Sequence, residues 1–480
     1  MRRLLSNRLL TPPSTTSPIP TAIELPQDLR AERAVESLRG LPNLLFLDSS
    51  DGGGAGRYSY VMADPFLSIT SRGRNVRIQA GDEVKSIHED PFSTIQRLLR
   101  GYICSAIDGL PPFQGGVAGY WSYDLGRTIE ELPTSALDDL FLPELHVGFY
   151  DWVIAWDHSL GKSWLCSTGL PSGTVETARH RADQVLEFLA SPQSHGPVES
   201  FHVGPLRSNF THQEYLEAVS RVLEYIAAGD VYQVNLSQRF SGNWEGDAWE
   251  LYQRLRTMSP VPYAAYMEFP DVTVLSASPE SFLRTRGRLV ETRPMKGTRP
   301  RGATPQEDEQ LAIELVQSEK DRAENLMIVD LLRNDLGRVC QPGSIQVPLL
   351  FDLERYSHVW QLVSTVTGEL LPGRDAVDLL RHSFPGGSVT GCPKIRAMEI
   401  IEELEKVRRG IYCGAIGYLG FSGDMDTSIV IRTLVVAHGQ VHLQVGGGIV
   451  ADSDPQQEYD ETLAKAAALV AALAAEIDWR

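Results

Sequence analysis

The spacing of apolar residues differs between the first and second halves of this chain. In the first half, short β-prone runs bounded by turn residues lie at 57–62, 67–70, 76–80 and 146–155, which predicts the strands of a sheet. From Thr211, a Thr-x-x-Glu capping box leads into apolar residues at helical spacing that end at Gly229. This second pattern predicts an amphipathic helix.

The region after this helix mixes both patterns. A capping box at Thr304 and the pair Asp454-Pro455 predict the starts of two more helices, and strands are predicted at 414–419, 427–436 and 440–445. Residues 190–205 are rich in Pro, Gly and Ser, which is typical of a connection. We therefore expect an α+β protein with a β-rich portion over 21–195 and a second portion over 205–480 that mixes helices with antiparallel strands.

Composition narrows the class of protein. Residues 1–20 are basic, lack acids and are rich in Ser, Thr and Pro, so we expect a disordered tail, with an organelle transit peptide as the alternative. No stretch approaches the roughly 18 uninterrupted apolar residues of a membrane span. The formal charge of −18 argues against nucleic acid as a partner. Five cysteines without a CxxC pair predict neither a disulfide framework nor a zinc site, which fits the cytoplasm.

The segment RPMKGTRPR at 293–301 places Lys296 among three arginines. Neighbouring cations disfavour the protonated form of a lysine, so Lys296 could act as a nucleophile. A basic surface loop is the other interpretation, and the segment alone does not decide between them.

Acidic residues on the last predicted helix are candidate metal ligands. Glu458, Glu461 and Lys465 fall at i, i+3 and i+7 on one face, and two carboxylates one turn apart could share Mg²⁺. A solvated face with Glu461 and Lys465 as an ion pair is the alternative. Glu324, on another predicted helix, either completes the carboxylate set or is one more exposed acid.

Two glycine-rich segments could approach a ligand closely. Gly446, Gly447 and Gly448 follow an alternating strand, where backbone N–H groups can meet a carboxylate, although a bulge has the same signature. The segment 384–394 resembles a phosphate-binding loop, but Cys392-Pro393 precedes its lysine and breaks the Walker spacing. It also lacks the second glycine of a G-x-S-x-G nucleophile elbow.

Seven segments together resemble the chorismate-utilising family of anthranilate, aminodeoxychorismate, isochorismate and salicylate synthases. They are YQVNLSQ (232–238), SASPESF (276–282), RPMKGTRPRG (293–302), DRAENLMIVDLLRNDLGRV (321–339), FPGGSVTGCPKIRAMEIIEELE (384–405), GAIGYLGFSGDMDTSIVIRTL (414–434) and GGGIVADSDPQQEYDETLAK (446–465). Weaker similarity at 46–50 and 56–65 extends the resemblance over nearly the whole chain. It implies a single large α+β fold with antiparallel sheets packed face to face and helices outside.

The resemblance also implies roles for individual residues. Glu324 and Glu461, with Glu458 close by, would hold Mg²⁺ against the ring carboxylate of chorismate. Glu280 would be the general acid that protonates the departing C4 hydroxyl, as a buried carboxyl can. The substrate-binding set would comprise Gly297, Thr298, Ser388, Tyr412, Arg432, Gly446, Gly447, Gly448 and Lys465.

Within this family the chain is most similar to the aminodeoxychorismate enzymes. Water-adding relatives carry a lysine where this chain has Gln233, so ammonia is the expected incoming group. Anthranilate synthases carry alanine where this chain has Lys296, whereas the aminodeoxychorismate enzymes that use covalent catalysis carry lysine. Gln361 replaces a histidine that the family links to pyruvate elimination, which further opposes the anthranilate interpretation. Met295, in place of isoleucine, conserves volume.

The resemblance further implies a glutamine amidotransferase small subunit as partner, because the chain shows no amidotransferase signature of its own. Relatives hold tryptophan in an N-terminal pocket, and the loosely matching residues here are Ser49, Arg57, Tyr58, Pro262, Tyr263 and Ala264. Val261 replaces the serine of the inhibitor motif, which opposes feedback control. An anthranilate synthase large subunit and an inactive chorismate- or tryptophan-binding scaffold are the alternatives.

Overall fold

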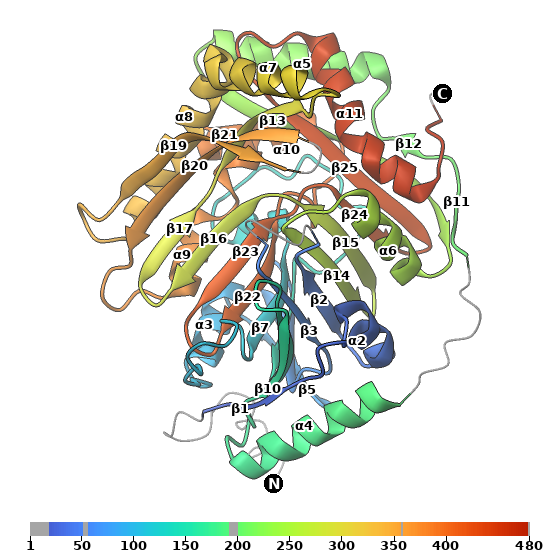
Figure 1. Ribbon diagram of the computed structural model, residues 1–480. Coiled ribbons are helices and arrows are strands. Elements are labelled where there is room, and N and C mark those ends of the chain that lie inside the picture. Colours follow the sequence, from blue (N-terminus) through green and yellow to red (C-terminus); the bar gives the residue numbers. More distant parts are fainter. Residues whose placement is uncertain (1–18, 51–55, 192–199, 357–358, 479–480) are drawn as a thin grey trace.

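The computed structural model describes residues 19–50, 56–191, 200–356 and 359–478. The predicted tail lies largely outside this part of the chain, as does the middle of the predicted connection at 190–205. The described residues form two large antiparallel sheets with helices around them (Figure 1). The prediction of an α+β fold with such sheets is confirmed.

The first sheet, as described, contains 13 strands. Its order is β1 (Thr21–Glu24), β10 (Lys162–Ser167), β9 (Trp152–Asp157), β3 (Tyr58–Met62), β2 (Leu44–Asp48), β14 (Tyr263–Phe269), β15 (Val272–Ser278), β24 (Thr433–Ala437), β25 (Gln440–Ile449), β13 (Gln233–Glu245) and β11 (His202–Val203), with β12 (Arg207–Ser208) and β21 (Gly391–Cys392) also on β13.

The second sheet contains 12 strands within the described residues. Its order is β18 (Met295–Pro300), β20 (Val359–Glu369), β17 (Leu289–Thr292), β16 (Ser281–Arg286), β23 (Met425–Ile429), β22 (Ala415–Gly420), β7 (Gly116–Trp121), β8 (Leu145–Tyr150), β4 (Leu67–Arg72), β5 (Asn75–Ala80) and β6 (Glu83–His88), with β19 (Gln346–Arg355) on β20.

Both portions of the chain contribute to both sheets. In the first sheet β2 pairs with β14, and in the second β7 pairs with β22. Tyrosine and aliphatic side chains from the two sheets share one core, for example Tyr60 and Val153 from the first sheet and Tyr120 and Ile416 from the second. Burying these apolar side chains holds the sheets face to face.

The helices cover the outer faces. The first sheet packs against α2 (Ala31–Leu38), α4 (Val175–Ala190), α6 (Ala248–Met258) and α11 (Pro455–Leu473), and the second against α3 (Pro91–Leu99), α8 (Glu319–Gly337) and α9 (Ala376–Ser383). A further core joins β13 to α5 (His212–Ala227) and α10 (Lys394–Leu404). The remaining helices are α7 (Pro305–Gln317) and the 3₁₀ turns η2 (Tyr123–Thr128) and η3 (Gly387–Val389). No helix of the described chain is long and apolar enough to span a bilayer.

Local sequence signals locate most of these elements correctly. The helix starts expected at Thr211, Thr304 and Asp454 are confirmed, and each of these side chains accepts a backbone hydrogen bond from the first turn. Thr211 and Glu214 form the complete capping box. Caps act within one helical turn, which is why they are legible without tertiary information.

Two predicted strands are wrong as single elements. The run 146–155 is divided into β8 and β9, and the run 427–436 into β23 and β24, with one member of each pair in either sheet. Every residue of β8 and β9 is buried, so the apolar pattern continues across the break and does not reveal it. At the second break Arg432 takes a left-handed conformation with φ of 50°, which ends one strand and redirects the chain.

Candidate active site

Lys296 and Ser388, which lie 92 residues apart in the sequence, meet at the edge of the second sheet. Lys296 lies in β18, and its Nζ donates to the carbonyl oxygen of Ser388 at 3.4 Å. That bond is long, and Nζ has no other hydrogen-bond or ion-pair partner among the described residues. Ser388 belongs to η3, and its hydroxyl is hydrogen-bonded to the carboxyl of Glu280. Lys296 and Glu280 therefore face the same serine.

Glu280 lies where the chain crosses from β15 in the first sheet to β16 in the second. Its side chain is buried, and burial raises the pKa of its carboxyl above the ordinary value. The Ser388 hydroxyl and the charges of Lys296 and Arg432 oppose this shift without cancelling it. A carboxyl that keeps its proton in a buried site is suited to donate that proton.

Arg432 lies at a second crossing between the sheets, from β23 to β24. Its guanidinium has no hydrogen-bond or ion-pair partner within the described residues. Burial lowers its pKa, an effect that the nearby carboxyl of Glu280 opposes. Because a guanidinium presents five donors in a planar fork, an unpaired one beside a buried carboxyl is a strong candidate for binding a carboxylate ligand.

The backbone of β25 forms the floor of this site at two glycines. A methyl group added to Gly448 would lie 2.4 Å from Nε2 of Gln233 and 3.5 Å from Nζ of Lys296. One added to Gly447 would lie 3.1 Å from Oε2 of Glu458. Both amide atoms of Gln233 are buried without a partner in the described structure. The glycines therefore bring functional side chains within reach of the strand, and the close-approach interpretation of this segment agrees with its geometry.

The three predicted metal ligands lie on two helices that flank β25 and β18. Glu458 and Glu461 project from α11, and Glu324 projects from α8. Burial raises the pKa of Glu458, against a hydrogen bond from Ser453, and it also raises the pKa of Glu324. Burial acts on Glu461 in the same direction, but nearby lysines outweigh it and hold its pKa below the ordinary value.

Oxygen donors of this kind suit Mg²⁺, but their present arrangement is not a closed metal site. Oε1 of Glu461 pairs with Nζ of Lys465 at 2.7 Å, and Ser453 donates to Glu458 at 2.6 Å. In the described part of the chain no three His, Cys, Asp or Glu side chains gather closely enough to hold a metal ion. The carboxylates fit a hard cation in kind, and binding one would require Glu461 to exchange Lys465 for it.

The predicted substrate residues border the same space. Lys465 also donates to the carbonyl of Gly446 at 2.9 Å, and Thr298 accepts a hydrogen bond from Gln361 at 3.2 Å. Gly297 has φ of 83°, and a methyl group there would lie 2.9 Å from Cβ of Asp321. Tyr412 is buried. We refer to the four residues at the centre of this region as the lysine cluster: Lys296, Gln233, Glu280 and Arg432.

One part of the sequence argument is not met. The three arginines around Lys296 are not free cations, because each is paired with an acid: Arg293 with Glu354, Arg299 with Glu314 and Asp321, and Arg301 with Asp308. Instead, the charges that act on Lys296 include the carboxyl groups of Glu280, Glu324 and Glu461.

A second lysine near the site is not predicted from the sequence: Lys320 acts electrostatically on Glu324, Glu458 and Glu461. Its position four residues before Glu324 on one helix is the signal that could have identified it.

The six residues of the predicted tryptophan pocket line one cavity between the sheets, of about 1400 Å³. Ser49 donates to the carbonyls of Tyr58 and Pro262. Arg57 pairs with Asp157 at 2.6 Å, and Arg284 donates to the hydroxyl of Tyr263 at 3.1 Å. Ala264 is in the wall formed by β14. We call this space the intersheet cavity; it is separate from the lysine cluster, none of whose residues lines it.

Comparison with known proteins gives consistent matches. A family model described as chorismate binding enzyme matches residues 48–471. The chain is 43% identical over 411 residues to aminodeoxychorismate synthase component 1 of Escherichia coli, covering 85% of this chain and 88% of that protein. It is 39% identical over 444 residues to anthranilate synthase component 1 of Aquifex aeolicus, covering 91% and 90%. A crystal structure of anthranilate synthase component I from Streptococcus pneumoniae is similar with a TM-score of 0.78 and 33% identity, covering 86% of this chain and 92% of that one.

Proposed function

Because this chain belongs to the chorismate-binding enzyme family, we propose that it converts chorismate and ammonia to 4-amino-4-deoxychorismate. Aminodeoxychorismate synthases that are 40–43% identical over most of the chain support this activity, and the anthranilate synthases that are also similar give the alternative less support. The observation that carries the proposal is the position of Lys296. Its Nζ faces Ser388 and Gly448 with a single long hydrogen bond, which leaves it available to react.

Substrate binding follows from the unpaired charges. Chorismate carries two carboxylates. Arg432 lacks a partner in the described chain and would hold the enolpyruvyl carboxylate, with Tyr412 and the backbone of Gly447 and Gly448 beside it. When bound, Mg²⁺ would neutralise the ring carboxylate. Glu324 and Glu461, with Glu458 close by, would hold it there, and Lys465 would be released from Glu461.

Glu280 and Lys296 would serve the same step. Nucleophilic attack needs a neutral amine, and departure of the C4 hydroxyl needs a proton donor. Burial raises the pKa of Glu280, which favours the protonated carboxyl that the donor role requires. Ser388 contacts both residues, through its hydroxyl and through its carbonyl, and so holds the acid and the amine near one another.

The chemical steps then balance without an external oxidant. The lone pair of Nζ of Lys296 forms a bond to ring C2, both ring double bonds shift, and the C4–O bond breaks as Glu280 protonates the hydroxyl, which leaves as water. Ammonia then adds at C4, both double bonds shift back, and the bond between C2 and Lys296 breaks with its electron pair returning to Nζ. The carboxylate of Glu280 can take a proton from the added ammonia, which restores the starting state.

Gln233 favours ammonia over water as the incoming group. Its amide lies beside Lys296 and Gly448 without a hydrogen-bond partner within the described structure, and an amide is too weak a base to deprotonate water. Ammonia needs no such activation, because its nitrogen already carries a free lone pair. A second family activity, release of anthranilate, is disfavoured because position 296 is lysine and position 361 is glutamine.

The pathway and partners form part of the same proposal. The names of the relatives contain "component 1", which implies another component. We propose that it is a glutamine amidotransferase subunit that supplies ammonia. The product would serve 4-aminobenzoate and folate synthesis in the cytoplasm. We further propose tryptophan as the occupant of the intersheet cavity, where aromatic and charged side chains meet.

The test is to incubate the purified chain with chorismate, Mg²⁺ and ammonium and to identify the products by chromatography and mass. Aminodeoxychorismate that forms only with ammonium is the expected result. Anthranilate with pyruvate would assign the other aminating activity, and isochorismate would overturn the argument from Gln233. Absence of any product, even with a glutamine amidotransferase subunit and glutamine present, would favour an inactive scaffold.

A further inference from the structure

A buried arginine, which is not itself a member of the lysine cluster, contacts three of the segments that surround the cluster. Arg409 follows α10, and its side chain is 1% exposed. It donates to the carbonyl of Val389 at 2.8 Å and to the carbonyl of Asn235 at 2.6 Å. Its guanidinium also lies 5.9 Å from the ring centre of Tyr412. Val389 adjoins Ser388, and Asn235 lies two residues from Gln233.

Glu405 orients this guanidinium. Its two carboxylate oxygens accept from Arg409 at 2.7 and 3.0 Å, and one of them also accepts from the backbone and hydroxyl of Ser237. The pair is fixed on both sides, since Tyr123 lies beneath the guanidinium with its ring centre at 4.7 Å. Bidentate pairing fixes the plane of an arginine more precisely than a single contact can.

The loop that carries Ser388 is held partly by its own hydrogen bonds and partly from outside. Within it, the amides of Val389 and Thr390 reach their acceptors only at 3.4 Å, beyond the usual range for such bonds, while the Thr390 hydroxyl donates to the carbonyl of Gly386 at 3.0 Å. From outside, Arg409 donates to the carbonyl of Val389 and the amide of Asn235 donates to that of Thr390, both at 2.8 Å. The position of Ser388 therefore depends in part on contacts from outside the loop.

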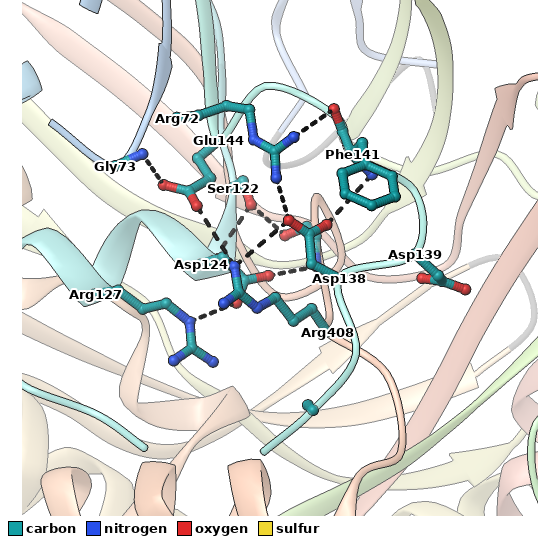
Figure 2. A network of polar contacts seen from close by, with 12 residues as sticks. Arg72, Gly73, Ser122, Asp124, Arg127, Asp138, Asp139, Phe141, Glu144 and Arg408 are labelled. Atoms are coloured by element: carbon teal, nitrogen blue, oxygen red, sulfur yellow. Dashed lines mark hydrogen bonds and ion pairs between the residues drawn. The ribbon is translucent and has the colours of Figure 1, made fainter. Parts of the chain in front are cut away.

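The residues on either side of Arg409 are held by a separate network. Figure 2 shows Arg408 reaching the carboxylates of Asp138 and Glu144, which lie at 3.6 and 3.9 Å. The backbone amide of Gly410 donates to Asp124 at 2.8 Å, and the Ser122 hydroxyl donates to the carbonyl of Gly410 at 2.6 Å. The two consecutive arginines thus have different partners: Arg408 joins this network, and Arg409 joins the carbonyls of Val389 and Asn235.

We propose that Arg409 is a positioning residue for the reaction, which holds the Ser388 loop, strand β13 and Tyr412 in register around the substrate. It touches no reacting atom and acts through the carbonyls of Val389 and Asn235. The proposal rests on the proposed function for its kinetic consequence. The packing role that it assigns to Arg409 can be measured without turnover.

The test compares Arg409→Lys with Arg181→Lys. Lysine keeps a positive charge against Glu405 but cannot reach both carbonyls and the carboxylate together. Arg181, on α4, is a matched control, because it is partly buried and also paired with acids, Asp64 and Asp151, but neither acid is bonded to the segment that carries Arg409. We expect Arg409→Lys to lower kcat/KM by at least about ten-fold, as loss of precise placement can, and to raise KM for chorismate. Loss of folded molecules alone would lower apparent kcat and leave KM unchanged.

Amide hydrogen exchange in residues 386–391 provides the second readout. We expect faster exchange there in Arg409→Lys and wild-type exchange in Arg181→Lys. Wild-type KM and wild-type exchange in Arg409→Lys would overturn the proposal, as would equal losses in both variants. If Arg409→Lys does not fold, the double variant Arg409→Met with Glu405→Gln removes both charges and is judged by the same criteria. A wild-type protein without chorismate turnover would refute the proposed function, while exchange still decides the role of Arg409.

Discussion

The intersheet cavity and the lysine cluster differ in how far their charged side chains are paired within the protein. Three arginines that line the cavity have acidic partners: Arg57 pairs with Asp157, Arg284 with Asp426 and Glu291, and Arg293 with Glu354. In the lysine cluster, Arg432 and both amide atoms of Gln233 have no partner in the described structure, and Lys296 has one long contact. The cavity keeps some unpaired atoms of its own, Oδ1 of Asp426 and the hydroxyl of Tyr60, but most of its cationic side chains are already paired.

This difference indicates where binding energy is available. A buried polar group without a partner is unfavourable by about 1–3 kcal/mol, so a ligand that supplies the missing partner recovers that amount. A ligand entering the intersheet cavity must compete with ion pairs that already exist. Cavity volume alone would therefore identify the intersheet cavity as the reaction site, whereas the unpaired polar groups identify the surroundings of Lys296.

The largest effect is expected when the amine of Lys296 is removed from the lysine cluster. We expect Lys296→Ala to lower kcat by roughly 10³-fold or more, because a covalent nucleophile cannot be replaced by its neighbours. The fold should remain, since the side chain makes one weak contact. Chorismate turnover and thermal unfolding measure the two effects. Lys162, a half-exposed lysine on β10 that pairs with Glu24, is the control, and Lys162→Ala should keep full activity. Unchanged turnover in Lys296→Ala would exclude it as the nucleophile.

The next largest effect concerns the proton on Glu280. We expect Glu280→Gln to lower kcat by roughly 10²-fold or more. Because the general acid must be protonated, activity falls as pH rises through the pKa of Glu280. The Ser388 hydroxyl lowers that pKa, so Ser388→Ala should move the alkaline limb of kcat/KM to higher pH. Ser383→Ala, whose buried hydroxyl has no partner in the described chain, should leave the limb in place. A limb that moves to lower pH in Ser388→Ala would contradict the assignment of Glu280.

A smaller effect is expected at the carboxylates that flank the cluster. Glu324→Gln should raise the Mg²⁺ concentration for half-maximal activity by roughly ten-fold to a hundred-fold, the usual range for loss of a group that supports a metal. Titration of activity with Mg²⁺ measures this shift. Glu319→Gln, an exposed acid on the same helix, should respond like wild type. A wild-type response in Glu324→Gln would remove it from the ligand set.

The smallest effect on turnover is expected in the intersheet cavity. Arg57→Met removes a half-exposed ion pair with Asp157, and exposed pairs contribute little to stability, so chorismate turnover should stay within about two-fold of wild type. If tryptophan occupies this cavity, it should raise the melting temperature of wild type and raise that of Arg57→Met less. If saturating tryptophan does not change the melting temperature of wild type, tryptophan is not the occupant of the cavity. If Arg57→Met loses most of its chorismate turnover, the cavity is not functionally separate from the lysine cluster.

Sequence reasoning identified the residues of the lysine cluster more reliably than the cause of their properties. Glu280, Lys296 and Arg432 were named from motifs, and the structure brings them together. The supposed cause, free arginines around Lys296, was wrong because Glu354, Asp321 and Asp308 approach those arginines from other segments. Pairings of this kind depend on tertiary contacts, which local spacing does not encode.

The breaks within the two apolar runs were hidden for a related reason. A strand buried on both faces has no polar alternation, so 146–155 and 427–436 each look continuous. The left-handed conformation of Arg432 also has no local signal, because arginine rarely adopts it. The role of Arg409 cannot be predicted from the sequence either, because its partners come together only when β13, η3 and the segment after α10 are folded.

Each sheet contains strands from both portions of the chain, so neither sheet can be completed until nearly the whole protein has been synthesised. The contact between Ser122 and Gly410 spans 288 residues of chain, and β7 beside it pairs with β22. At roughly 5–20 residues per second on the ribosome, β7 waits some tens of seconds for its neighbour. During that interval the nascent chain exposes unpaired strand edges, which favour aggregation. We therefore expect the first half of the protein to depend on chaperones until the second half has been translated.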